Sequence, residues 1–79
     1  SDTTLSQEIK ALYPTIRNLS YGKIERNPST DSTKLQFVLL FSGDNVNEAQ
    51  LEKWLRLRLK GQDIEVIRTG IQSASEAKR

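Results

Sequence analysis

"EKWLRLRLKG", residues 52–61, alternates leucine with arginine or lysine, and such alternation is typical of a half-exposed β-strand. The residues on either side of this stretch indicate a helix instead. Asn47 is a type of residue that caps helix N-termini, Gln50 follows at the capping-box position, and Gly61 is the type that commonly ends a helix. Because both ends are specified, we predict a helix over residues 48–60.

On this predicted helix, leucine recurs every fourth residue at Leu51, Leu55 and Leu59, and the spacing predicts one apolar stripe that faces the core. Trp54 lies beside the stripe and is either a core residue or a platform for a partner. Leu57 lies outside the stripe, because it is roughly 120° around the helix from Leu51 at about 100° per residue.

The N-terminal segment TTLSQEIKALYP predicts another helix, because Leu5, Ile9 and Leu12 share one face and Pro14 stops a helix at that point. Three strands and a polar loop are predicted from alternating apolar residues and from turn residues. The strands are NLSYGKIER at 18–26, where Gly22 weakens the strand or marks a bulge, KLQFVLLFS at 34–42 and QDIEVIRT at 62–69, and the loop is NPSTDST at 27–33.

The strand at 34–42 carries apolar side chains on both faces, which predicts a central position in the sheet. Val38, Leu40 and Ile67 would project from the face opposite the helices, unless the first helix covers that face instead. An exposed apolar face on a small sheet suggests a partner. Leu40 is therefore one candidate partner contact.

The predicted element order α-β-β-α-β indicates an α+β fold, a two-layer sandwich with both helices on one face of a three-stranded mixed sheet. The first two strands would pair antiparallel, and the helix at 48–60 would cross right-handedly to a parallel third strand. This arrangement is similar to a ferredoxin-like unit lacking its first strand. The chain has 79 residues, which predicts a single domain over residues 1–70 and a disordered tail over 71–79.

The chain lacks histidine, cysteine and methionine, so it has neither the imidazole nor the thiolate ligands of common metal sites. No pair of carboxylates has a spacing that indicates a catalytic cleft. We therefore predict no catalytic residues, no metal, no cofactor and no enzymatic activity. The formal net charge of +2 is mildly basic, and no ribonucleoprotein motif is present, so nucleic-acid binding is not expected either.

Two interpretations of the cations Arg56, Arg58 and Lys60 remain open. They are either a solvated helix end, where cations complement the helix dipole, or a candidate anion contact for phosphate, a lipid headgroup or partner carboxylates. Tryptophan, arginine and an apolar residue outside the core stripe are types enriched at interfaces. Trp54 and Leu57 are therefore candidate partner contacts alongside Leu40.

The segments EIKALYP, L-S-x-G, FVLLF and LEKWLRLRLKGQDIEVI together resemble the soluble end segment of a family of bacterial hydrophobic membrane proteins. That family is domain of unknown function 389, in its Bacteroidetes form. The resemblance implies a non-catalytic interaction or regulatory domain attached to membrane segments outside this sequence, on a side that it does not specify. The partner would be a second copy or another domain of the same chain. The alternative function is an anionic-surface binding module for acidic lipid or nucleic acid.

Overall fold

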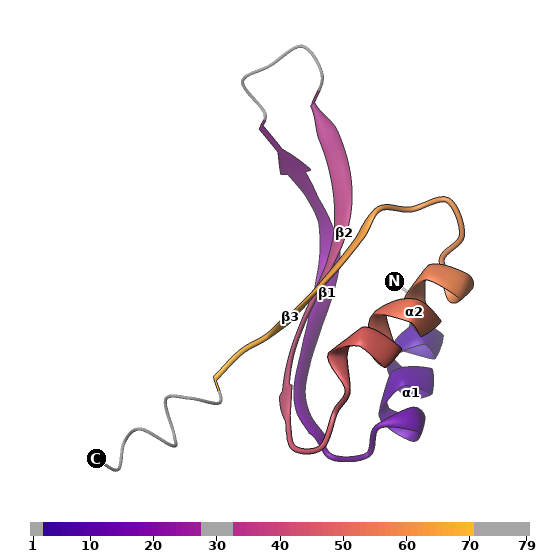
Figure 1. The fold of residues 1–79 in the computed structure, drawn as a ribbon, viewed down its shortest axis with the longest axis vertical. Helices are drawn as coiled ribbons and strands as arrows, with labels where there is room; N and C mark the ends of the chain where they lie inside the picture. Colours follow the sequence, from indigo (N-terminus) through magenta and orange to yellow (C-terminus); the bar gives the residue numbers. More distant parts are fainter. Residues whose placement is uncertain (1–2, 28–32, 71–79) are drawn as a thin grey trace.

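The computed structural model describes residues 3–27 and 33–70 of the chain. Within these ranges the elements are α1 (Thr3–Leu12), β1 (Ile16–Arg26), β2 (Lys34–Gly43), α2 (Glu48–Arg58) and β3 (Ile64–Arg68). Both helices lie on one side of the sheet, as Figure 1 shows. The predicted element order and two-layer α+β fold are thus confirmed. The predicted tail and most of the predicted loop lie outside the described residues.

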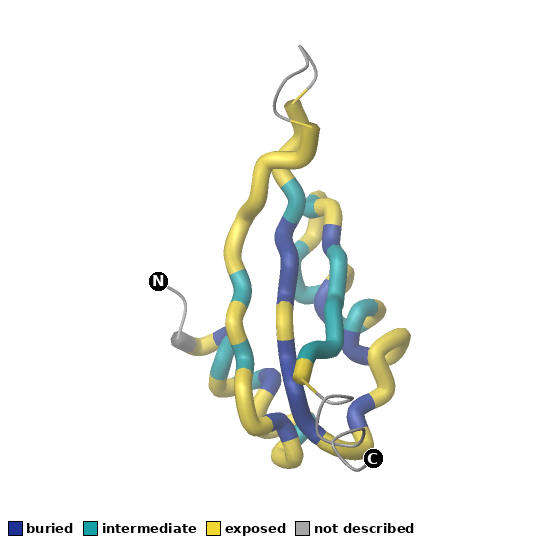
Figure 2. The backbone as a smooth tube through the Cα atoms, turned by 90° about the vertical axis from the view of Figure 1, so that its left-hand side faces the viewer, coloured by how far each residue is buried: buried dark blue, intermediate teal, exposed yellow. Residues whose placement is uncertain are grey.

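The three strands are arranged in the order β1-β2-β3, so β2 is central as predicted. β1 pairs antiparallel with β2, and β3 pairs parallel with β2. The chain passes from β2 through the helical layer to β3 on the far side of β2 from β1, which gives the predicted right-handed crossover (Figures 1 and 2). The face without helices is turned toward the viewer in Figure 2.

The core lies between β2 and the two helices. Alternate residues of β2 point into it, because successive side chains of a strand point to opposite faces. α1 contributes Leu5 and Ile9, and α2 contributes Leu51 and Leu55, which confirms the predicted stripes at these positions. The largest fully buried side chains are Phe41, Leu5, Ile9, Leu39, Leu51 and Leu55.

α2 begins where the sequence predicts and ends earlier. Asn47 caps the helix, since its side chain accepts a hydrogen bond from the Gln50 backbone N–H at 3.0 Å. The helix ends at Arg58, and Gly61, with φ 83°, lies in the turn that follows. Lys60 therefore lies outside the last helical turn. The predicted end is two residues too late because Gly61 was expected to follow the helix directly.

β1 also differs from its prediction at one end. It begins at Ile16, which pairs with Gly43, and its register shifts between Ile16 and Asn18. Gly22 pairs regularly with Val38, so the bulge proposed at Gly22 is absent. The irregularity instead lies where β1 leaves the turn after α1.

The uncovered face of the sheet exposes less apolar surface than predicted. Val38 is only 4% exposed although it lies on this face, whereas Leu40 is 38% exposed. Arg26 of β1 reaches across β2 and donates hydrogen bonds to Gln36, at 2.7 Å, and to Glu65 of β3. Because Val38 pairs with Glu65, this polar network lies next to it. The prediction that Val38 is an exposed apolar residue is therefore wrong.

Candidate functional site

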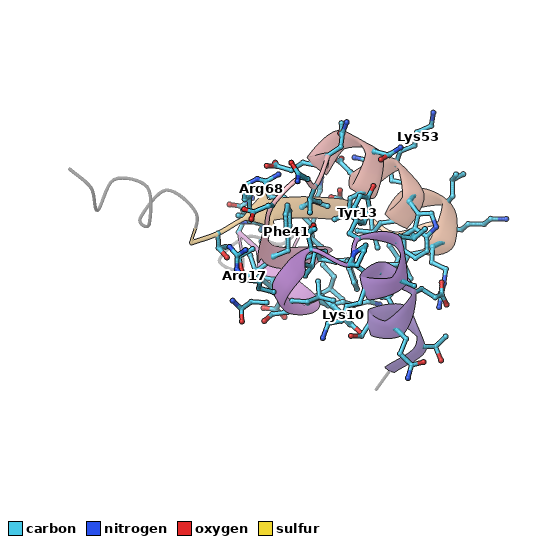
Figure 3. All side chains as sticks on the ribbon, turned by 90° about the horizontal axis from the view of Figure 1, so that it is seen from below. Lys10, Tyr13, Arg17, Phe41, Lys53 and Arg68 are labelled. Carbon is cyan, nitrogen blue, oxygen red and sulfur yellow. The ribbon has the colours of Figure 1, made fainter. Side chains whose placement is uncertain are left out.

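A shallow groove lies between the C-terminal end of α1 and the outer side of α2. It has a volume of about 320 Å³ and is lined by Leu12, Tyr13, Gln50 and Trp54. We call it the helical groove. Pro14 ends α1 here, and the backbone N–H of Tyr13 still bonds to the carbonyl of Ile9 at 2.9 Å. Tyr13 consequently projects from the end of α1 toward α2 (Figure 3).

Tyr13 and Gln50 connect the two walls of the helical groove. The Tyr13 hydroxyl donates a hydrogen bond to Gln50 Oε1 at 2.9 Å. Gln50 sits in the first turn of α2, at the predicted capping-box position. Its side chain binds Tyr13, which lies 37 positions away in the sequence. The apolar groove thus has one fixed polar pair at its edge.

The helical groove continues into an exposed apolar strip on α2. Gln50, Trp54 and Leu57 follow the i, i+4, i+7 spacing that places side chains on one face of a helix. Leu57 is 65% exposed, and Leu12 on the opposite wall is 51% exposed. Trp54 is partly buried and packs against the core while it also lines the groove. The core interpretation of Trp54 is thus confirmed in part, and its role as a platform for a partner stays a prediction.

The three candidate partner contacts do not form one surface. Trp54 and Leu57 lie together on the helical layer, whereas Leu40 lies on the opposite face of the sheet, between Ser20 and Ile67. Leu12 and Tyr13 belong to the groove but were missed as candidates. Leu12 was predicted to face the core, but it lies in the last turn of α1 and is half exposed. Pro14 could have indicated the exposure of Leu12, because it ends the helix and the final side chains of a helix are often exposed.

Two of the three candidate anion contacts are held by carboxylates of the protein itself. Arg58 of α2 makes a bidentate ion pair with Glu8 of α1, with N–O distances of 2.9 and 3.1 Å. Arg56 pairs with Glu52 one turn earlier on α2. Lys60 makes no ion pair with the described residues. The three cations are therefore not gathered into one free anion site.

We expect the Glu8–Arg58 pair to couple the two helices by about 1 kcal/mol, the upper end for exposed pairs, because it is bidentate and partly buried. A double-mutant cycle of Glu8→Gln and Arg58→Gln in urea unfolding measures this coupling. The Glu52–Arg56 pair within α2 is the matched control, with about 0.3–0.5 kcal/mol expected. Equal coupling energies in the two cycles would show that the bidentate, partly buried geometry of Glu8–Arg58 adds nothing beyond an exposed pair within one helix.

The side chains of the two helices define what this part of the molecule offers chemically. In residues 3–27 and 33–70, no group of three or more Asp, Glu, His or Cys side chains is placed to hold a metal ion. Over the same residues, none of the helices combines the length and hydrophobicity needed to cross a membrane. The carboxylates of both helices accept arginine hydrogen bonds, and the helical groove offers apolar and aromatic surface with one amide–hydroxyl pair.

Comparison with known proteins places the chain in one family. Residues 1–69 match the family described as Domain of unknown function (DUF8492), and the chain belongs to that family. No curated protein and no solved structure matches the chain. None of these comparisons links it to domain of unknown function 389, so that resemblance stays a prediction.

Proposed function

We propose that this DUF8492 domain is a non-catalytic protein-interaction or regulatory domain whose partner docks on the helical groove and on Leu57. The observation that carries the proposal is the exposure of Leu12 and Leu57 on either side of two aromatic side chains. Covering apolar surface of this kind removes it from water, which is the main favourable term in protein association. Tyrosine and tryptophan are also residue types that dominate binding energy at interfaces.

The groove is suited to docking because its walls are already ordered. Trp54 is held by its packing against the core, and Tyr13 is held by its hydrogen bond to Gln50. Immobilising a side chain on binding costs about 0.5–1.5 kcal/mol, and a side chain that is fixed beforehand avoids much of this loss. A partner would therefore meet a preformed aromatic surface.

We propose, in addition, that the domain works as part of a bacterial membrane protein whose membrane segments lie outside this sequence. This part rests on the resemblance to domain of unknown function 389, and reading the surrounding open reading frame tests it. The alternative, an anionic-surface module based on Arg56, Arg58 and Lys60, has less support. Two of those cations already bind carboxylates of the domain.

Site-specific photo-crosslinking tests the proposed docking surface, because it captures whichever protein contacts the labelled position. A photoreactive amino acid replaces Leu12 or Leu57 in the full chain, in cells of the source organism. We expect defined protein adducts from both positions, seen as discrete mass shifts on immunoblots and identified by mass spectrometry.

Leu35 is the matched control, because it is 58% exposed and lies on the β1–β2 hairpin. Adducts formed equally from Leu35 and Leu57, or no adducts from Leu12 and Leu57, would contradict the proposal. An adduct with a second copy of this chain would identify self-association as the docking event.

A further inference from the structure

We infer that the partner docking on the helical groove is an acidic polypeptide segment, which places apolar side chains in the groove and carboxylates beside Lys53. The inference rests on the proposed function and adds the chemistry of the partner. It follows from the distribution of unpaired charge over the helical layer, from the groove's apolar lining, and from the type of cation left free.

The carboxylates of the two helices are all occupied. Each carboxylate forms an ion pair with an arginine, whose guanidinium group binds carboxylates through a rigid fork of hydrogen-bond donors. The pairs are Glu8 with Arg58, Glu48 with Arg68, and Glu52 with Arg56. The described helices therefore present no unengaged carboxylate that could attract a basic partner.

Lysines on the same helices are unengaged. Lys10 and Lys53 make no ion pair with the described residues. Lys53 precedes Leu57 by four residues on α2, so the two side chains are neighbours on the helix surface. It projects outward from α2, as Figure 3 shows. The apolar strip is thus bordered by a positive charge that none of the described carboxylates neutralises.

This charge pattern selects among the candidate partners. A second copy docking through the same surface would bring Lys53 of each copy into the same interface, and like charges placed together at an interface oppose association. Nucleic acid is recognised mainly through arginine and lysine contacts to phosphate. Here the arginines of α2 bind carboxylates, and the surface beside Lys53 is apolar. An acidic segment with apolar side chains satisfies both features.

The size of the groove fits side chains of a partner polypeptide. Its volume of about 320 Å³ lies at the lower limit of ligand pockets, roughly 300–1,000 Å³. It can accept one or two apolar side chains, while Leu12 and Leu57 extend the contact to either side. Amphipathic segments that dock in helical grooves use this arrangement of apolar anchors with charges along the rim.

Trp54 is the sole tryptophan of the chain and reports on the groove by its fluorescence. The probes are three short amphipathic peptides without tryptophan: leucine with glutamate, leucine with lysine, and alanine with glutamate. We expect the leucine–glutamate peptide to shift Trp54 emission and to bind about tenfold more tightly than either of the others. Its affinity should fall as salt is added, because exposed charges are screened.

Variants with matched controls locate the binding. Lys53→Glu should weaken the leucine–glutamate peptide by up to about fivefold, and Leu57→Ser by about tenfold. The controls Lys34→Glu and Leu35→Ser make the same chemical changes at exposed positions of the hairpin and should leave the affinity unchanged. All four positions are exposed, so the fold should tolerate each substitution.

Four outcomes would overturn the inference. Equal binding of the acidic and basic leucine peptides, sensitive to Leu57→Ser, would leave a groove that docks apolar segments without charge preference, so the proposed function would survive. Vesicles with anionic lipid that bind through Lys53 and Leu57 in place of the peptide would identify a lipid surface. Sedimentation showing a dimer lost on Leu57→Ser would identify a second copy. No binding of any probe, together with no crosslinks from Leu12 or Leu57, would remove the proposed function as well.

Discussion

Replacing Gly43 with alanine is expected to lower the free energy of unfolding by about 3 kcal/mol, from backbone strain and overpacking together. Such a loss is a large share of the stability of a small domain, for which roughly 0.05–0.15 kcal/mol per residue is typical. Gly43 is the last residue of β2, and its φ of 156° is one that residues with a side chain rarely adopt.

The space beside Gly43 is filled by backbone. A Cβ at this position would lie 2.6 Å from the Thr15 carbonyl oxygen and 2.7 Å from Ile16 Cα. Backbone atoms cannot rotate away as a side chain can, and this backbone is held in place. Gly43 pairs with Ile16 across the sheet, and its carbonyl accepts a hydrogen bond from Arg68 at 2.9 Å.

Gly22→Ala is the matched control, because a Cβ at Gly22 meets nothing within 4 Å. Glycine within a strand is less stable than alanine by about 0.5–1 kcal/mol, so this change should be neutral or slightly stabilising. Urea unfolding followed by circular dichroism measures both variants. If Gly43→Ala unfolds at the same urea concentration as Gly22→Ala, the close approach of β2 to the turn before β1 does not constrain the native fold.

The parts of the fold that sequence predicts well are those specified by local chemistry. β2 follows from an unbroken apolar run that fills both faces of a strand, and the start of α2 follows from Asn47, whose capping bond is present. The burial of Val38 on the uncovered face of the sheet could not be predicted in this way. Val38 is apolar and points away from the helices, yet it is buried, and its neighbours across the sheet are Gly22 and Glu65, which come from other strands. Alternation within one strand carries no information about them.

Only part of the candidate site could be predicted, again because a pattern within one element carries no information about other elements. Helical spacing identifies Trp54 and Leu57, because both lie on one element. Tyr13 enters the groove only when the end of α1 meets α2, and no local pattern encodes that meeting. The ion pair of Arg58 could not be predicted from a local pattern either, since its partner Glu8 is 50 positions away in the sequence. Once Arg56 and Arg58 are assigned to their carboxylate partners, Lys53 is the cation of α2 that makes no ion pair with the described residues.

Leu55 and Leu57 provide the second large expected effect, and they test the helix that decides the fold. Leu55→Ala should lower the free energy of unfolding by about 2–5 kcal/mol, because it leaves a cavity in the core. Leu55 is fully buried between α2 and the sheet. Leu57→Ala should change the stability by less than about 0.5 kcal/mol, since that side chain is exposed.

The same two substitutions distinguish helix from strand because the residues are two positions apart. In a strand, Leu55 and Leu57 would point to the same face and alanine would cost about the same at each. In a helix they lie about 160° apart at 100° per residue, so one faces the core and the other faces solvent. Urea unfolding of the two variants therefore tests the arrangement directly. Comparable losses would contradict α2, and with it the helical groove, whose far wall is Gln50 and Trp54.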